Sequence, residues 1–175
     1  LARVDPEVAA TSAPFLVTRA WLYAYQGRAR DALTDLRRAA AVATPGPLPD
    51  GSPSVEATAA VINSIYAIEG LPSVLPSAAT ADELVEATST WRPLVDLGIG
   101  CSLFMTGDLL AAQSAFDRVL ASRDGLLRAN AIGWGTVIDV MLGNLSSARA
   151  RFDDGARVWI EDPALTRLPQ VVVAK

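Results

Sequence analysis

The sequence contains no histidine and a single cysteine, Cys101. Without histidine, the commonest general base and the commonest metal ligand are missing, so catalysis would have to depend on carboxylates. One cysteine cannot form an intrachain disulfide, which favours a reducing, cytoplasmic setting.

Charged residues make up only 19% of the chain and the net charge is −4. This charge argues against a broad nucleic-acid-binding surface.

Long apolar runs are also missing. Asp96, Asp108 and Asp139 interrupt the most apolar stretches, so none reaches the roughly 18 residues needed to span a membrane. No signal-peptide pattern opens the chain. What is present is an excess of Ala, Leu and Val with helical periodicity almost from end to end, which predicts an all-α protein. Because the chain begins at Leu1 and ends within an apolar pattern, VVVAK, we expect it to be part of a longer protein.

Four apolar stretches each end in a glycine, at Gly27, Gly70, Gly107 and Gly143. The spacings between these glycines are 43, 37 and 36 residues, which is the range of helical-hairpin repeats. A glycine just after a helix adopts the left-handed conformation at little steric cost, so each one can turn the chain into a second, antiparallel helix. The pattern predicts an α-solenoid of about four antiparallel helix pairs, forming one domain over residues 1–175.

The second helix of each pair should bury residues five, nine and twelve positions after its glycine. Three repeats agree on small or bulky apolar side chains there: Ala32, Leu36 and Ala39; Ala112, Phe116 and Val119; Ala148, Phe152 and Gly155. The second repeat instead gives Leu75, Ala79 and Asp82, and it contains Pro72 and Pro76. We therefore expect its second helix to start late or to kink.

Helix boundaries follow from proline, glycine and capping residues. The segment TPGPLPDGSP predicts a loop, with Ser52 as the N-cap and Pro53 as the first helical residue. Asp162-Pro163 is expected to open a further helix in the same way. Helices are predicted over residues 13–26, 29–43, 53–69, 74–87, 91–106, 109–122, 126–142, 145–160 and from 163 onward.

The segment GDLLAAQSAFDRVL, preceded by Gly100 and Leu103-Phe104, resembles a tetratricopeptide repeat. Residues 91–175 and, more loosely, 17–42 resemble the repeat region of large LuxR-type regulators of the MalT-like group. In that family a nucleotide-binding switch domain precedes the repeats and a helix-turn-helix DNA-binding domain follows them. The resemblance implies that these repeats sense an inducer or partner and control the switch. The sequence contains no Walker-type glycine loop and no basic recognition helix, so ATP and DNA contacts are not assigned to its residues.

The first helices of such repeats line a concave surface. The periodicity and the resemblance place twelve residues there: Val17, Trp21, Ala24, Tyr25, Ser64, Leu97, Cys101, Phe104, Met105, Trp134, Val137 and Met141. A protein segment or a small apolar inducer is predicted to contact seven of them: Trp21, Tyr25, Ser64, Cys101, Phe104, Met105 and Trp134. Tryptophan and tyrosine combine a large apolar area with one hydrogen-bonding group, which suits the wall of a binding site. The alternative is that these residues pack against the next helix of a tightly wound array.

The sequence predicts a protein that is not an enzyme and that binds no metal or cofactor. Its partners would be the protein segment or inducer and the flanking domains of the same chain. A free-standing adaptor that binds only proteins is the alternative, and a helical enzyme that uses Asp82, Glu83 or Glu86 is a remote one. Thr80-Ala-Asp-Glu fits a capping box better than a catalytic group.

The only basic cluster is formed by Arg28, Arg30, Arg37 and Arg38. Aspartates are interleaved with it within helical reach, which favours a solvated charged face over an anion-binding site. Asp153-Asp154 beside Arg149, Arg151 and Arg157 is interpreted in the same way.

Overall fold

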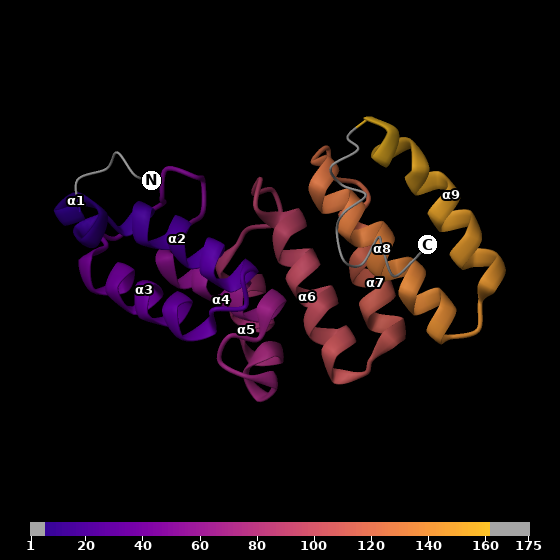
Figure 1. Cartoon of the computed structure of the whole chain (residues 1–175), viewed down its shortest axis with the longest axis horizontal. Helices are drawn as coiled ribbons and strands as arrows, with labels where there is room; N and C mark the ends of the chain where they lie inside the picture. The colour runs from indigo at the N-terminus through magenta and orange to yellow at the C-terminus, as the bar shows by residue number, and fades with distance from the viewer. Residues whose placement is uncertain (1–5, 162–175) are drawn as a thin grey trace. The chain divides into compact units, whose positions relative to one another are not determined.

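The computed structural model describes residues 6–161, with side-chain surroundings for residues 9–155 and 158, and every element in this part of the chain is a helix (Figure 1). The prediction of an all-α chain is confirmed for these residues. The helices, in chain order, are α1 (Pro6–Thr11), α2 (Ala13–Tyr25), α3 (Ala29–Val42), α4 (Val55–Tyr66), the 3₁₀ helix η1 (Leu71–Ser73), α5 (Val74–Leu84), α6 (Arg92–Thr106), α7 (Leu109–Val119), α8 (Gly125–Met141) and α9 (Leu145–Glu161).

Eight of the helices predicted from the sequence are present, with ends that differ by a few residues. Helix α1 was not predicted, because a short PEVAAT segment has no clear apolar periodicity. The helix predicted from residue 163 onward lies outside the described residues. Among the described residues, no helix is long and apolar enough to cross a membrane.

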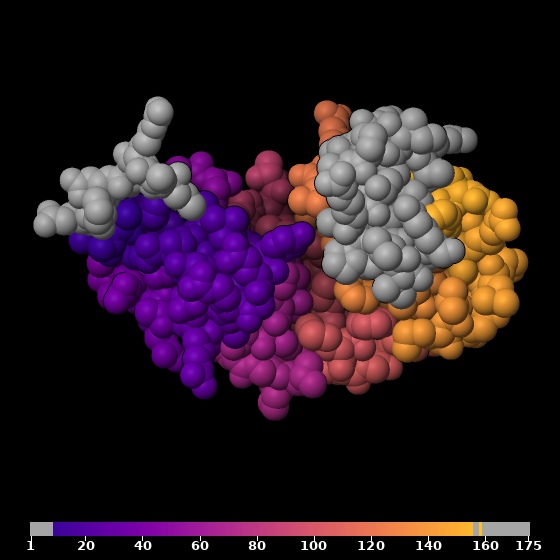
Figure 2. Space-filling model, viewed as in Figure 1, coloured from indigo at the N-terminus to yellow at the C-terminus, as the bar shows by residue number. Residues whose placement is uncertain are grey.

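The packing of the chain divides it into two compact units, residues 1–98 and 99–175, and α6 contributes residues to both. In the first unit α2 packs against α3 and α4 packs against α5; in the second, α8 packs against both α7 and α9. The space-filling view shows that side chains close the gap between the ribbons of α2 and α3 (Figure 2). One domain over residues 1–175 stays a prediction.

Glycines with positive φ reverse the chain between paired helices. Gly27, Gly107 and Gly143 have φ values of 72°, 90° and 78°, and they lie between α2 and α3, α6 and α7, and α8 and α9. The backbone N–H groups of Arg28, Asp108 and Asn144 then donate to carbonyls five residues back. These bonds satisfy the last carbonyls of each helix, as predicted for glycine at a helix end.

The second pair departs from this pattern. Gly70 does have a positive φ of 96°, but α4 has already ended at Tyr66, and the left-handed residue at its end is Ala67, with φ of 50°. The chain then forms η1 before α5 begins. The predicted helix over 53–69 is therefore three residues too long at its end.

The start of α4 also differs from the prediction. The hydroxyl of Ser54, not that of Ser52, accepts a hydrogen bond from a backbone N–H, that of Ala57, at 3.0 Å. Ser52 is fully buried, and its hydroxyl accepts a hydrogen bond from Thr58 at 3.0 Å. A serine in a tight loop can form either bond, and the sequence cannot distinguish them.

Buried positions on the second helices confirm three of the four predicted stripes. The side chains of α3 and α7 at these positions are at most 5% exposed, and Ala148 and Gly155 of α9 are also buried. Phe152 is only half-buried. On α5 the stripe is shifted by one residue from the predicted positions, and it consists of Val74, Ala78, Ala81 and, after the helix, Val85. The predicted positions were counted from Gly70, but the left-handed residue that ends α4 is Ala67, and η1 lies between this turn and α5.

Candidate functional site

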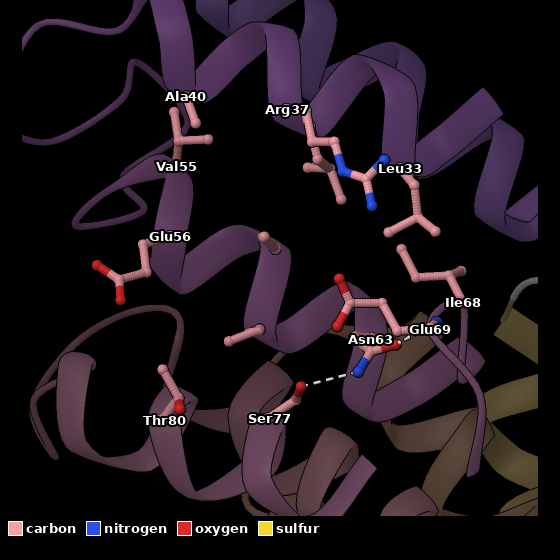
Figure 3. A pocket seen from close by; sticks show the side chains of 13 residues that line it. Leu33, Arg37, Ala40, Val55, Glu56, Asn63, Ile68, Glu69, Ser77 and Thr80 are labelled. Carbon is pink, nitrogen blue, oxygen red and sulfur yellow. Dashed lines mark hydrogen bonds between the residues drawn. The ribbon is translucent and has the colours of Figure 1, made fainter. Parts of the chain in front are cut away.

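A groove of about 490 Å³ lies in the first unit between α3 and α5, with α4 as its floor (Figure 3). Both α3 and α5 pack against α4. The lining residues come from these three helices and from the turn after α4: Leu33, Leu36, Arg37, Ala40, Val55, Glu56, Ala59, Ala60, Asn63, Ile68, Glu69, Ser77 and Thr80.

Small residues line the middle of the groove. Ala59 and Ala60 of α4 form the centre of the floor, Ala40 lies on the α3 side and Ser77 on the α5 side. An alanine presents only a methyl group, so side chains from facing helices leave space between them. The volume falls within the range of ligand pockets, about 300–1,000 Å³.

Apolar side chains occupy both ends of the groove. Figure 3 shows Val55 and Ala40 at one end and Leu33 and Ile68 at the other. Val55 and Ile68 are each 7% exposed, so most of their surface already packs against the core. The apolar surface that a ligand can contact at the two ends is therefore mainly that of Ala40, which is exposed, and Leu33, which is half-buried.

Three charged side chains surround the groove without partners of their own. Arg37 reaches from α3 into the groove, while Glu56 and Glu69 lie on the α4 side (Figure 3). All three residues are exposed, and their charged groups form no ion pair or hydrogen bond with any residue that the structure describes. Their charges are therefore available to a ligand.

Asn63 organises the polar part of the floor. Its amide nitrogen donates to the hydroxyls of Ser73 and Ser77, each at 2.8 Å, and its amide oxygen accepts from the backbone N–H of Glu69 at 2.8 Å. These bonds join the end of α4 to η1 and α5. They hold the turn that carries Glu69 in a defined position beside the groove.

The residues predicted to form a concave site fall on both units. In the first unit Trp21 is half-buried, with its ring 6.2 Å from that of Tyr66 and 6.5 Å from that of Trp91, measured between centroids. Tyr25 is 66% exposed. Ser64 is 1% exposed, and its hydroxyl donates to the carbonyl of Val61 at 2.8 Å. Trp21 therefore belongs to an aromatic cluster, whereas Ser64 is enclosed by its own helix and by α6.

In the second unit Phe104 and Trp134 are brought together, with ring centroids 4.9 Å apart. Both residues are half-buried, as is Met105. Cys101 is buried, and burial raises the pKa of its thiol to about 12. A thiol with this pKa stays protonated and unreactive at neutral pH. Of the other predicted surface positions, Val17, Ala24 and Leu97 are buried, Val137 is half-buried and Met141 is 58% exposed.

The acidic residues considered for catalysis have structural partners or lie on the surface. Asp82 forms an ion pair with Arg92 at 2.6 Å, and Glu83 and Glu86 are exposed. The hydroxyl of Thr80 donates to the carbonyl of Pro76 inside α5, so it does not cap a helix. No group of three or more histidine, cysteine or acidic residues that could hold a metal occurs among the described residues.

The two arginine-rich segments predicted to be solvated faces are only partly so. Arg151 forms an ion pair with the buried Asp139 at 2.9 Å, whereas the pair of Arg149 and Asp153 is exposed. Arg28 pairs with Asp31 on the surface, but Arg37 from the same cluster lines the groove.

The groove was not predicted: of the residues that line it, none belongs to the predicted concave surface, and it depends on contacts among α3, α4 and α5 that the periodicity does not show. The sequence does contain one signal for it. The second repeat departs from the others, with prolines and small residues where they have bulky ones, and this is the repeat whose second helix forms one wall of the groove.

Comparison of the chain with protein-family models, curated proteins and solved structures found no match.

Proposed function

We propose that the chain is a non-catalytic helical-repeat module that binds a partner in the groove between α3 and α5. The observation that supports this proposal is the combination of an alanine floor, apolar ends and three charged side chains without partners. Binding sites of proteins commonly combine apolar surface with a few placed polar groups.

We also propose that the repeats form a tetratricopeptide-like solenoid. Support comes from the recurring helix pairs, the positive-φ glycines between them and the equivalent buried positions on α3, α7 and α9. Proteins of this kind bind partners along extended surfaces, and each repeat contacts mainly its neighbours.

The biological setting that we propose is the cytoplasmic sensing region of a LuxR-type, MalT-like transcriptional regulator. This proposal depends on the resemblance of residues 91–175 and on the order of the repeat positions within them. The partner would then be a protein segment, a small apolar inducer or a flanking domain. A free-standing tetratricopeptide adaptor is the alternative. The sequence of the full-length protein distinguishes them: a P-loop upstream and a helix-turn-helix downstream support the regulator, and their absence supports the adaptor.

The groove can be tested with a fluorescent probe that is both apolar and anionic, 8-anilinonaphthalene-1-sulfonate. We expect saturable binding to the folded chain, and we expect Ala59→Leu to weaken it at least several-fold because the larger side chain fills the floor. Ala41→Leu, on the exposed side of α3 and outside the groove, is the matched control. Circular dichroism checks that both variants remain helical. Equal binding by the wild type and Ala59→Leu would show that the groove is not the site.

The predicted first-helix surface is tested separately, by acrylamide quenching of single-tryptophan variants. A surface that binds requires Trp21 and Trp134 to be accessible, and each is half-buried against other aromatic rings. We expect both to be quenched more than Trp91, which is 8% exposed. If Trp21 and Trp134 are fully shielded and no added partner changes their emission, these residues are core packing only.

A further inference from the structure

The helices α3, α4 and α5 of the first unit correspond to α7, α8 and α9 of the second. Each of these triplets begins with the second helix of one pair, α3 or α7. The two helices of the next pair follow it: α4 and α5 in the first unit, and α8 and α9 in the second. The buried stripes align Leu36 of α3 with Phe116 of α7, and Ala78 of α5 with Phe152 of α9. The left-handed residues at the helix ends align Ala67 with Gly143. The internal geometry of the two units can therefore be compared position by position.

In the second unit an arginine connects all three helices. Arg151 of α9 donates from Nη1 to Asp117 of α7 at 2.7 Å and from Nε to Asp139 of α8 at 2.9 Å. Its side chain crosses α8 at Gly135, where an added Cβ would lie within 3.0 Å of the guanidinium. Asp139 is 1% exposed. The carboxylate of Asp117, one residue after the buried Phe116, is thus paired with Arg151 within the protein.

The equivalent positions in the first unit are occupied by Arg37, Ser77 and Asn63. Arg37 follows Leu36 as Asp117 follows Phe116, Ser77 precedes Ala78 as Arg151 precedes Phe152, and Asn63 lies four residues before Ala67 as Asp139 does before Gly143. The contact between the last two positions persists, because Asn63 donates to Ser77 at 2.8 Å.

The contact to the third position is missing. In the second unit, Arg151 on the last helix has a long side chain whose charge is opposite to that of Asp117. In the first unit the equivalent residue is Ser77, which is too short and carries no charge to pair with Arg37. Ala59 stands eight residues before Ala67, where the second unit has Gly135 eight residues before Gly143. Since no side chain has to cross α4 there, the methyl group of Ala59 is tolerated. The second unit has a pocket of about 410 Å³ that Arg151 itself lines, so the two units differ less in open space than in charge: in the groove of the first unit, the guanidinium of Arg37 has no acidic partner among the described residues.

We propose that a carboxylate of a bound partner segment supplies the acid that Arg37 lacks. This inference rests on the proposed binding function and names the chemistry of its ligand: a peptide segment with one aspartate or glutamate flanked by apolar residues. The acidic side chain pairs with Arg37, and the flanking residues contact the apolar ends of the groove at Ala40 and at Leu33. Arginine binds carboxylates through two parallel hydrogen bonds, which orients the segment as well as holding it.

The other charges of the groove restrict the ligand further. Glu56 and Glu69 lie on the α4 side and form no ion pair with any of the residues that the structure describes, so the groove holds one positive and two negative charges. A segment with several acidic residues is repelled by these glutamates. A segment with a single acid and a nearby lysine or arginine carries both signs of charge, as the groove does.

The test uses two synthetic helical peptides built from alanine, leucine and lysine, identical except for a central glutamate or glutamine. The full chain, labelled with ¹⁵N, is titrated with each peptide, and the Arg37 Nε–Hε signal is followed together with backbone signals of α3, α4 and α5. We expect the glutamate peptide to bind about tenfold more tightly than the glutamine peptide. We also expect the preference to shrink as salt is raised from 50 to 500 mM, roughly, because an exposed ion pair is screened.

Two variants test the role of Arg37 and one serves as their control. Arg37→Gln should abolish the preference for the glutamate peptide, whereas Arg38→Gln, on the same helix but outside the groove, should retain it. Ser77→Glu places a carboxylate inside the protein at the position equivalent to Arg151. This variant should pair with Arg37, raise the melting temperature and also abolish the preference.

The outcomes separate this inference from the proposed function. If both peptides shift the groove signals with equal affinity, the groove remains a binding surface and carboxylate recognition by Arg37 is wrong. A glutamate preference that survives in Arg37→Gln also overturns it. If neither peptide shifts the Arg37 signal at millimolar concentration while the anilinonaphthalene probe still binds, the peptide is the wrong ligand class and the inference fails. Loss of binding by both the peptides and the probe contradicts the proposed function as well.

Discussion

Each of the three buried aspartates in the described part of the chain pairs with an arginine. Asp35 pairs with Arg19 and Asp96 with Arg92, and Arg151 is the partner of the third, Asp139. A guanidinium suits this role because it remains charged and offers several donors in a fixed plane. The hydrogen bonds that Arg19 donates to Asp35 raise the pKa of this arginine. Burial lowers the pKa of Arg92, but its hydrogen bonds to Asp96 and Asp82 outweigh this effect, so its pKa is raised as well. Removing one partner of such a pair leaves a buried charge uncompensated, which is more costly than the pair is stabilising.

Gly100 lies against the ring of Phe116 in the second unit, and replacing either residue should destabilise the protein. Phe116 is fully buried, so Phe116→Ala should lower the free energy of unfolding by about 3–5 kcal/mol. Gly100→Ala places a Cβ 2.6 Å from the Phe116 ring and should cost about 1–3 kcal/mol through overpacking. Half-buried Phe152 should cost less than Phe116 when replaced by alanine. Urea unfolding followed by circular dichroism measures all three.

A double variant checks the cause of the Gly100→Ala effect. If the clash with the ring is responsible, Phe116→Leu should reduce the additional cost of Gly100→Ala, because the smaller side chain leaves room for the methyl group. Strictly additive losses would mean that the two positions do not interact.

The buried thiol of Cys101 should be unreactive in the folded chain. Since its pKa is raised to about 12, reaction with a disulfide reagent at pH 8 should be slow in buffer and fast in urea. The thiol ionises in the unfolded chain at a lower pH than in the folded one. Its contribution to stability is therefore complete below about pH 9 and is lost as the pH rises toward 12, by about 1.4 kcal/mol per pH unit.

Unfolding of the wild type and of Cys101→Ala at pH 8 and pH 10.5 tests this dependence. The wild type should lose more stability than the variant between the two pH values. Equal losses would show that the thiol is accessible in the folded chain or that other groups dominate the alkaline transition.

At the scale of the helices, α4 and α8 differ in the residue that reverses the chain after the helix. Both helices end in the left-handed conformation, but α8 uses Gly143 and α4 uses Ala67. This conformation costs a residue with a Cβ roughly 1–2 kcal/mol, and Ala67 accepts the cost because Asn63 and its hydrogen bonds hold the turn.

We expect Ala67→Gly to stabilise the chain by about 0.5–1 kcal/mol, because the strain relieved exceeds the added entropy of the unfolded chain. Gly143→Ala, at φ of 78°, should destabilise it by about 1 kcal/mol. Thermal unfolding of both variants provides the comparison. A destabilised Ala67→Gly variant would show that the methyl group of Ala67 contributes packing that outweighs the strain.

At the scale of the whole molecule, the division into two units should appear in local stability. Contacts are concentrated within residues 1–98 and within 99–175, as expected when repeats stabilise mainly their neighbours. We expect Phe116→Ala to accelerate amide hydrogen exchange in α7 and α8 much more than in α2, α3 and α4. Mass spectrometry of peptide fragments measures this directly. A uniform increase along the chain would indicate one cooperative unit instead.

The sequence by itself determined where the helices lie and which faces they bury. Apolar periodicity, together with glycines at 27, 107 and 143, was sufficient for these features because helix formation and chain reversal depend on local interactions. The same reasoning failed by one residue on α5 and by three at the end of α4. There Ala67 reverses the chain through bonds to Asn63, and no local pattern distinguishes an alanine that does this from one that does not.

The tertiary structure alone decided which charges are paired and where the chain is hollow. Arg37 and Arg151 both lie in charged helical segments that the sequence presents as solvated faces. Only the packing of three helices shows that Arg151 reaches two aspartates while Arg37 reaches none. The reason is physical: an ion pair or a groove depends on side chains from segments tens of residues apart, and helical periodicity carries no information about their distance.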